Sequence, residues 1–302
     1  MSKGTGIGGT FMVSMMALAC AVIVAMVAII IGNILLHGAG GISWEFLSRA
    51  PEAGMTRGGI FPAIFGTAAL VILMTIAVIP LGVATAVYMH EYAPKRSRMI
   101  GLVRLAIQNL AGVPAIVFGL FGYVFFTKFV GAAIDRGLYG GELVYGQPAI
   151  IWAALTMALL TLPTVVVATE EALRAIPQSY REAAYALGAT RWQMIRRVVL
   201  PQATGGILTG GILAVSRGSG EVAPVMFTGA AYFLPELPRR LHDQFMELGY
   251  HVYVMTTQSI DVEATKPVLY STVLVLLMLT FLLNFTAIMI RSRIRRRLRH
   301  DR

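Results

Sequence analysis

The sequence is poor in the residues that build disulfide frameworks and metal sites. Its 302 residues include a single cysteine, Cys20, so a disulfide within the chain is impossible and a site of several thiolates is excluded. The five histidines lie without the spacing of metal ligands, at His37, His90, His242, His251 and His300. We therefore expect the chain to carry neither a metal ion nor another cofactor.

Lysine is also scarce, and its placement excludes one class of nucleotide site. The four lysines are preceded by Ser2, Pro94, Thr127 and Thr265. A phosphate-binding P-loop needs glycine before its lysine and serine or threonine after it. The chain therefore lacks a P-loop, and we expect that it is not an enzyme and that any ATP hydrolysis takes place on a partner chain.

Charge is low for a soluble domain. Only 13% of the residues are charged and 57% are hydrophobic. In soluble domains, about a quarter of all residues are charged. An apolar run of about 20 residues is long enough to cross a bilayer. The chain has six such runs, at Phe11–Leu36, Phe61–Met89, Leu105–Val130, Ala149–Thr169, Thr204–Phe227 and Val268–Ile290. The sequence thus predicts an all-α polytopic membrane protein with six transmembrane helices.

The distribution of basic residues predicts the orientation. Seventeen of the 25 lysines and arginines lie in segments on the same side as the N-terminus, seven lie in the opposite segments, and Arg217 lies within a span. Cytoplasmic segments are the ones rich in lysine and arginine. We therefore expect both termini in the cytoplasm of a bacterial inner membrane. The net charge of +10 then reflects topology and attraction to anionic lipid, and it does not require a nucleic-acid partner.

The loop of residues 170–203 is expected on the same side and carries signals of a defined shape. Ser179 and Glu182 have the spacing of a capping box, and Thr190 and Gln193 have the spacing of a second one. Gly188 between them suits a left-handed helix stop. The sequence predicts two short helices, the second of which ends at Leu200-Pro201. A helix-turn-helix has a similar outline and a plain solvated loop is the other alternative, but transmembrane flanks argue against DNA, and a shaped loop favours a protein partner.

The same loop contains, in order, Glu182-Ala183-Ala184, Gly188, Ile195 and Leu200-Pro201. This pattern resembles the EAA loop of ABC-transporter permease subunits. The resemblance implies a type I ABC importer permease fold, in which the loop enters a groove of the ATP-binding subunit. The residues expected to couple to that ATPase are Arg181, Glu182, Ala183, Ala184, Leu187, Gly188, Ile195 and Pro201.

Small residues mark other spans. Pro80-Leu81-Gly82 with the later Tyr88, Glu91 and Tyr92 resembles the same permease family, as does the segment from Ala111 to Tyr123. In the fifth span, Gly206 and Gly210 form a small-x-x-x-small pair, which predicts close packing, and we expect its contact to be the equivalent helix of a partner permease. Beyond that span, Leu234–Phe245 is expected to form an amphipathic outer helix.

Arg217 and Glu221 are the only ionisable residues well inside any expected span. A lone charge at the membrane centre costs about 2.5–3.5 kcal/mol on insertion scales. Four residues apart, the two share a helix face and can pair, so a structural ion pair is one interpretation. The other is a substrate pathway, because a guanidinium is a planar donor suited to phosphate. Glu221 could accept a hydrogen bond from a protonated oxyanion.

The segment Arg217-Gly218-Ser219-Gly220-Glu221-Val222-Ala223-Pro224, together with Arg181–Gly188, resembles the PstA-type permeases of bacterial phosphate ABC importers. The similarity runs from about Pro80 to Gly229. It implies a heterodimer with a homologous second permease, a cytoplasmic ATP-binding subunit dimer and an extracytoplasmic phosphate-binding protein. It also implies that Arg217 is important for phosphate passage.

The sequence as a whole favours the permease subunit of an ATP-driven importer of inorganic phosphate. A permease for phosphonate, molybdate or sulfate remains an alternative, and so does a non-transporting membrane scaffold. We divide the chain into an N-terminal helix and outer loop (1–60), a permease core (61–290) with its coupling loop (170–203), and a basic cytoplasmic tail (291–302).

Overall fold

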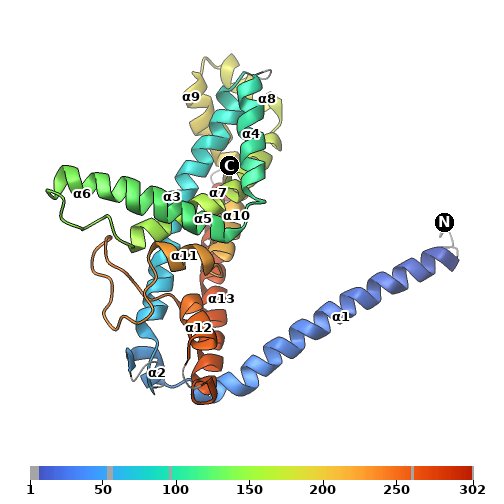
Figure 1. The fold of residues 1–302 in the computed structure, drawn as a ribbon. Coiled ribbons are helices and arrows are strands. Elements are labelled where there is room, and N and C mark those ends of the chain that lie inside the picture. Colours follow the sequence, from blue (N-terminus) through green and yellow to red (C-terminus); the bar gives the residue numbers. More distant parts are fainter. Residues whose placement is uncertain (1–6, 53–56, 95–96, 260–261, 301–302) are drawn as a thin grey trace.

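The fold is almost entirely helical (Figure 1). The structure is a computed structural model that describes residues 7–52, 57–94, 97–259 and 262–300. In the described residues, the only sheet is the antiparallel pair β1 (Pro51–Glu52) and β2 (Arg57–Gly58). The helical elements are α1 (Ile7–Gly38), η1 (Ala39–Gly41), α2 (Trp44–Ser48), α3 (Phe61–Val87), η3 (Tyr88–Tyr92), α4 (Arg98–Leu110), α5 (Ala115–Gly122), η4 (Tyr123–Gly131), α6 (Ala132–Leu138), α7 (Ile150–Arg174), α8 (Gln178–Ala186), α9 (Arg191–Met194), η5 (Ile195–Val199), α10 (Leu200–Gly218), α11 (Ala223–Thr228), α12 (Leu248–Thr257) and α13 (Val262–His300).

Six helices among the described residues are long and apolar enough to cross a membrane, which confirms the expected number. They are Phe11–Gly41, Phe61–Tyr92, Ala115–Leu138, Ile150–Arg174, Arg191–Gly218 and Thr265–Ile294. Figure 1 shows α4, α8 and α9 gathered at one end of the molecule and α2 and α12 toward the other. The loop that joins the fourth and fifth spans therefore lies at the opposite end from the outer segments.

The first span stands apart from the rest of the chain. In Figure 1, α1 projects away from the other helices and meets them only at its C-terminal end. There, the hydroxyl of Ser271 donates to the carbonyl of Gly38 over 2.9 Å, and the rings of His37 and Tyr270 lie 5.1 Å apart. A helix that is apolar on every side is stable only where lipid or another protein surrounds it. From Phe11 to Ile30 the residues of α1 are exposed, as in a membrane helix that lipid or another protein surrounds.

The core is built by α3, α7 and α10, which pack against one another. Its fully buried side chains include Met74 of α3 and Met157 of α7. The pair Gly206 and Gly210 of α10 faces Ala172 and Ala168 of α7. The expectation that this glycine pair contacts a partner permease is therefore wrong, because small residues on α7 occupy that face. Without side-chain bulk on either side, the two backbones approach closely.

The third span begins later than expected. We predicted one helix over Leu105–Val130, but α4 ends at Leu110 and the span runs over Ala115–Leu138. Pro114 explains the break, because proline has no N–H to donate and disfavours the helical conformation of the residue before it. In Figure 1, α5, η4 and α6 run crosswise to α3, while α4 lies at the same end of the molecule as α8 and α9 and contacts α7.

The fifth span also differs from its prediction at both ends. Leu200-Pro201 does not end a helix, since α9, η5 and α10 form one continuous span over Arg191–Gly218. The π-helical turn η5 precedes Pro201, and wider helical turns of this kind accommodate a missing N–H. At the other end, the expected helix over Thr204–Phe227 breaks after Gly218 and resumes as α11 at Ala223.

The outer segment Leu234–Phe245 is not the amphipathic helix that we expected. It is irregular, because Pro235 and Pro238 lie three residues apart and interrupt any helical turn. Its backbone instead covers the start of α7, where Ile150 donates its N–H to Asp243 over 2.9 Å and Ile151 donates to Leu241 over 3.1 Å. The segment thus supplies acceptors for N–H groups that a helix start leaves unpaired.

The contact between α10 and α7 can be tested with neighbouring glycines. Gly206→Ala should lower the thermal unfolding midpoint of the purified chain in detergent, because the new methyl overlaps Ala172 and overpacking costs about 1–3 kcal/mol. Gly205→Ala is the matched control, since no described atom lies within 4 Å of its Cβ position. We expect the control to leave the midpoint unchanged or higher, and equal midpoints for both variants would contradict the packing described here.

Candidate functional site

The loop between the fourth and fifth spans forms two helices that meet at Gly188. That glycine has a φ of 78°, a left-handed conformation in which a side chain is strained. After it, Thr190 and Gln193 form a capping box: the N–H of Gln193 donates to the Thr190 hydroxyl over 3.3 Å, and the N–H of Thr190 donates to the Gln193 amide oxygen over 2.9 Å. The predicted turn and the second capping box are therefore confirmed.

The first predicted capping box is wrong. Helix α8 begins at Gln178, so Ser179 lies inside its first turn, and no side chain caps the helix. Pro177 occupies the capping position with φ −56° and ψ 142°. Because this extended proline lies directly before the helix, the first turn starts two residues earlier than the Ser-x-x-Glu spacing indicates.

The residues expected to couple to an ATPase divide between two faces of the loop. Arg181, Ala184 and Ile195 are buried against the membrane helices, and Pro201 is half-buried. The opposite face is exposed and consists of Glu182, Ala183, Leu187 and Gly188. Leu187 is 89% exposed and Trp192 is 56% exposed. Exposed apolar side chains at the tip of a shaped loop indicate a surface that another protein covers.

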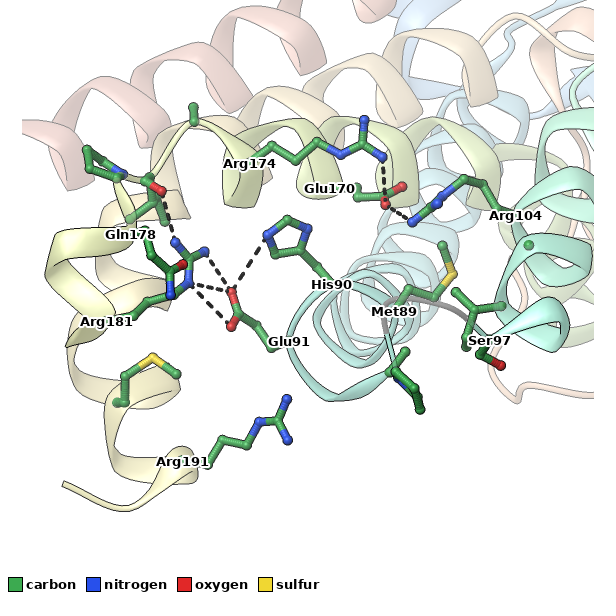
Figure 2. A pocket seen from close by; sticks show the side chains of 18 of the residues that line it. Met89, His90, Glu91, Ser97, Arg104, Glu170, Arg174, Gln178, Arg181 and Arg191 are labelled. Carbon is green, nitrogen blue, oxygen red and sulfur yellow. Dashed lines mark hydrogen bonds and ion pairs between the residues drawn. The ribbon is translucent and has the colours of Figure 1, made fainter. Parts of the chain in front are cut away.

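The buried arginine has a partner that the sequence did not reveal. The guanidinium of Arg181 donates to the carboxylate of Glu91 through Nη2 over 2.7 Å and through Nε over 3.1 Å (Figure 2). It also donates to the carbonyls of Ile176 over 2.9 Å and Leu173 over 3.0 Å. Glu91 lies 90 residues earlier in the chain, in η3. In the sequence, Glu91 stood out only as part of the motif that resembles the permease family, and nothing there identified Arg181 as its partner.

A cavity of about 780 Å³ lies beside this pair, between the end of the second span, α4, α7 and the loop. Across it, Arg104 of α4 and Arg174 of α7 both donate to the buried carboxylate of Glu170 (Figure 2). Arg191 of α9 lies over the ring of Tyr92, with 4.8 Å between its guanidinium carbon and the ring centroid. The cavity wall is therefore held by ion pairs and one cation–π contact.

Arg217 and Glu221 lie where the fifth span is interrupted. Their side chains are paired, with Arg217 Nε 3.7 Å from a Glu221 carboxylate oxygen, and they are 35% and 28% exposed. They do not share a helix face as expected, because α10 ends at Gly218 and Glu221 lies beyond its end. Gly218 packs against Met74 and Met157, which places this helix end on the core.

The outer segment returns to this same point. Gly249, at the start of α12, lies so close to Val222 that an added Cβ would overlap its side chain. The carboxylate of Glu247 accepts the N–H groups of Gly249 over 2.8 Å and Tyr250 over 2.6 Å, and its complete burial raises its pKa above the ordinary value. The break after α10 is therefore in contact with the capped start of α12.

The sequence and the architecture of this chain are similar to those of known proteins. Residues 78–300 match the family of binding-protein-dependent transport system inner membrane components. The chain belongs to this family. The permease is 31% identical over 264 residues to the probable ABC transporter permease protein YqgI of Bacillus subtilis, with 83% of this chain and 84% of that one covered. It is a multi-pass protein of the bacterial inner membrane.

The permease is also similar to PstA-type phosphate transport permeases, as its motifs indicated. It is 37% identical over 183 residues to PstA 1 of Mycobacterium tuberculosis, which covers 61% of this chain and 55% of that protein. With PstA of Xylella fastidiosa it shares 34% identity over 196 residues, covering 65% of this chain and 63% of the relative. The matched part thus spans between half and two thirds of the PstA relatives.

Solved structures confirm the type I ABC importer permease fold. A chain of a bacterial alginate ABC transporter superposes with a TM-score of 0.65 at 14% identity, covering 95% of this permease and 94% of that chain. A chain of the MetNI methionine transporter superposes with a TM-score of 0.55 at 16% identity, covering 77% of this permease and 94% of that chain. At such low identity, the agreement concerns the fold alone.

The left-handed turn at Gly188 gives a local prediction. Gly188→Ala should speed hydrogen exchange of the amides in residues 186–194, because a left-handed alanine costs about 1–2 kcal/mol. Gly188→Asn should show a smaller effect, since asparagine tolerates this conformation better. Hydrogen–deuterium exchange of the purified permease measures both. Identical protection in the wild type and the alanine variant would show that the turn does not need glycine.

Proposed function

We propose that this permease forms half of the translocation pathway of an ATP-driven importer of inorganic phosphate and couples to a separate ATPase subunit. The observation that carries the proposal is the Arg217–Glu221 pair at the interruption between α10 and α11. Transport sites in membranes are often built where helices are discontinuous. A guanidinium at such a place can bind an oxyanion with two parallel hydrogen bonds.

Glu221 gives a reason to prefer a protonated oxyanion such as phosphate over sulfate. Its carboxylate already orients Arg217, and it could accept a hydrogen bond from a protonated oxyanion, which fully deprotonated sulfate cannot donate. The relatives named PstA support the same substrate. The name of the Bacillus relative specifies no substrate, so the choice among phosphate, phosphonate, molybdate and sulfate depends on this site.

The proposed partners follow from the faces that the chain leaves uncovered. The exposed loop face around Leu187 and Trp192 would enter a groove of an ATP-binding subunit dimer. A homologous second permease would complete the pathway as a heterodimer, and an extracytoplasmic phosphate-binding protein would deliver the anion. The bias of lysine and arginine supports a cytoplasmic location for the loop 170–203 and for both termini. The core 61–290 would carry transport, preceded by residues 1–60 and followed by the basic tail 291–302.

The continuous fifth span suggests how ATP hydrolysis reaches the anion. Helix α9 of the loop runs through η5 into α10 without a break, and Arg217 lies in its last turn. At about 1.5 Å per residue, Arg217 is roughly 24 Å along the helix from Pro201. A displacement of the loop by the ATPase would therefore move the Arg217 end as part of one rigid element.

The anion site is tested by Arg217→Ala in the full assembly reconstituted into vesicles. We expect phosphate uptake to fall by at least about tenfold, because hydrogen bonds to a charged group contribute about 1.5–3 kcal/mol. Co-purification with the ATPase should be unchanged. Arg136→Ala on the outer side is the matched control and should transport normally. Normal uptake by the Arg217 variant would end the proposal for this site.

The substrate is tested by competition against labelled phosphate. Unlabelled phosphate should compete, whereas sulfate, molybdate and phosphonate in equal excess should not. Stronger competition by one of the other anions would identify this chain as a permease for that oxyanion. An assembly in which no substrate stimulates ATP hydrolysis would instead indicate a non-transporting scaffold.

A further inference from the structure

Two adjacent residues at the cytoplasmic end of the second span contact both helices of the coupling loop. Glu91 pairs with Arg181 of α8, and Tyr92 lies under Arg191 of α9. Both belong to the π-helical turn η3. Because π-helical turns are rare and are often found at functional sites, this turn merits a role of its own.

The contact with α8 is buried and geometrically specific. The side chains of Arg181 and Glu91 are 8% and 6% exposed. The guanidinium also bonds the carbonyls of Leu173 and Ile176 at the end of α7. One side chain of the loop is therefore fastened to the second span through a carboxylate and to the fourth span through backbone carbonyls.

Two side chains of α8 are buried, Arg181 and Ala184. Ala184 belongs to a small apolar cluster that includes Val87 and Met89 of the second span. On the side toward α4, a cavity of about 780 Å³ borders α8 (Figure 2). Because one alanine buries little apolar area, the directional contact between α8 and the second span is the ion pair of Arg181 with Glu91.

The energetics of a buried ion pair favour a positional role over a stabilising one. Removing one partner is strongly destabilising, because it leaves an uncompensated buried charge. Replacing both partners by apolar residues of similar volume is often neutral for stability. Fold stability alone therefore gives no reason for charges here, whereas a bidentate pair defines one relative position of the helices that it joins.

We propose that Glu91 and Tyr92 form the polar attachment point through which displacement of the coupling loop moves α3 together with α7 and α10. Glu91 is a positioning residue that acts through Arg181. The inference rests on the proposed function, because it assumes that an ATPase displaces the loop. Helices α7 and α10 are connected to the loop by the chain itself, whereas α3 contacts the loop through this polar pair and a small apolar cluster.

The test uses the complete assembly in vesicles and compares ATP hydrolysis with phosphate uptake. In the double variant Glu91→Met with Arg181→Met, the chain should fold and retain the ATPase, while the ATP hydrolysed per phosphate transported rises by about fivefold or more, the lower range of coupling between sites. Glu91→Asp, which keeps the charge, should show a smaller rise. Thermal unfolding and co-purification of the same samples report folding and assembly.

Arg174→Gln is the matched control. It removes an arginine from the same cavity wall, but this side chain is 57% exposed and pairs with Glu170 of its own helix, not with Glu91 or Tyr92. Its ratio of ATP hydrolysed to phosphate transported should equal that of the wild type. A double variant with a normal ratio, or a control with an equally raised ratio, would overturn the attachment role.

The two proposals fail in different ways. If the wild-type assembly takes up another oxyanion, the phosphate assignment falls and the attachment is tested with that anion. If no anion stimulates ATP hydrolysis in the wild type, both proposals fall. If wild-type phosphate uptake is normal and the double variant is fully coupled, the proposed function stands and the attachment alone is refuted.

Discussion

The close approach of α10 to α7 is the constraint on which the rest of the permease depends. Gly206 and Gly210 face Ala172 and Ala168, so two backbones meet where larger side chains would keep them apart. In lipid, such packing replaces the hydrophobic drive that joins helices in water. Because α10 is fixed on α7, its last turn is positioned against α3 as well, and the location of Arg217 follows from contacts many residues away.

That position allows the interruption of a helix inside the membrane. Every backbone N–H and C=O in lipid needs a partner within the protein. At the break, Ser219 donates to Val215 over 3.0 Å, Gly220 donates to Arg217 over 3.3 Å, and Val225 donates to Val222 over 3.1 Å. These three N–H groups thus have partners within the chain while two charged side chains remain accessible, which is the combination that an anion pathway needs.

The sequence could predict the features that depend on local composition. Apolar runs identified six spans, and the glycine and threonine of the loop identified its turn and its second helix. It could not locate the breaks within those runs, because proline and small residues interrupt a helix without lowering its hydrophobicity. Pro114 separated α4 from a span that we expected to be continuous, whereas Pro201 was accommodated by η5 and interrupted nothing. The same residue type had opposite outcomes in two contexts.

The long-range pair of Arg181 and Glu91 could not be predicted from the sequence for a different reason. An arginine in a water-facing loop is normally exposed, and nothing local indicated that Arg181 is buried against a carboxylate 90 residues away. The π-helical turn η3 lies where the second span contacts the loop, and η5 lies where the loop continues into the fifth span. Another π-helical turn, η4, lies in the span of α5 and α6. An added residue in a helical turn rotates the side chains that follow it. At η3, Glu91 contacts α8 and Tyr92 contacts α9. The rotation of side chains in that single turn therefore determines whether one span can contact both helices of the loop.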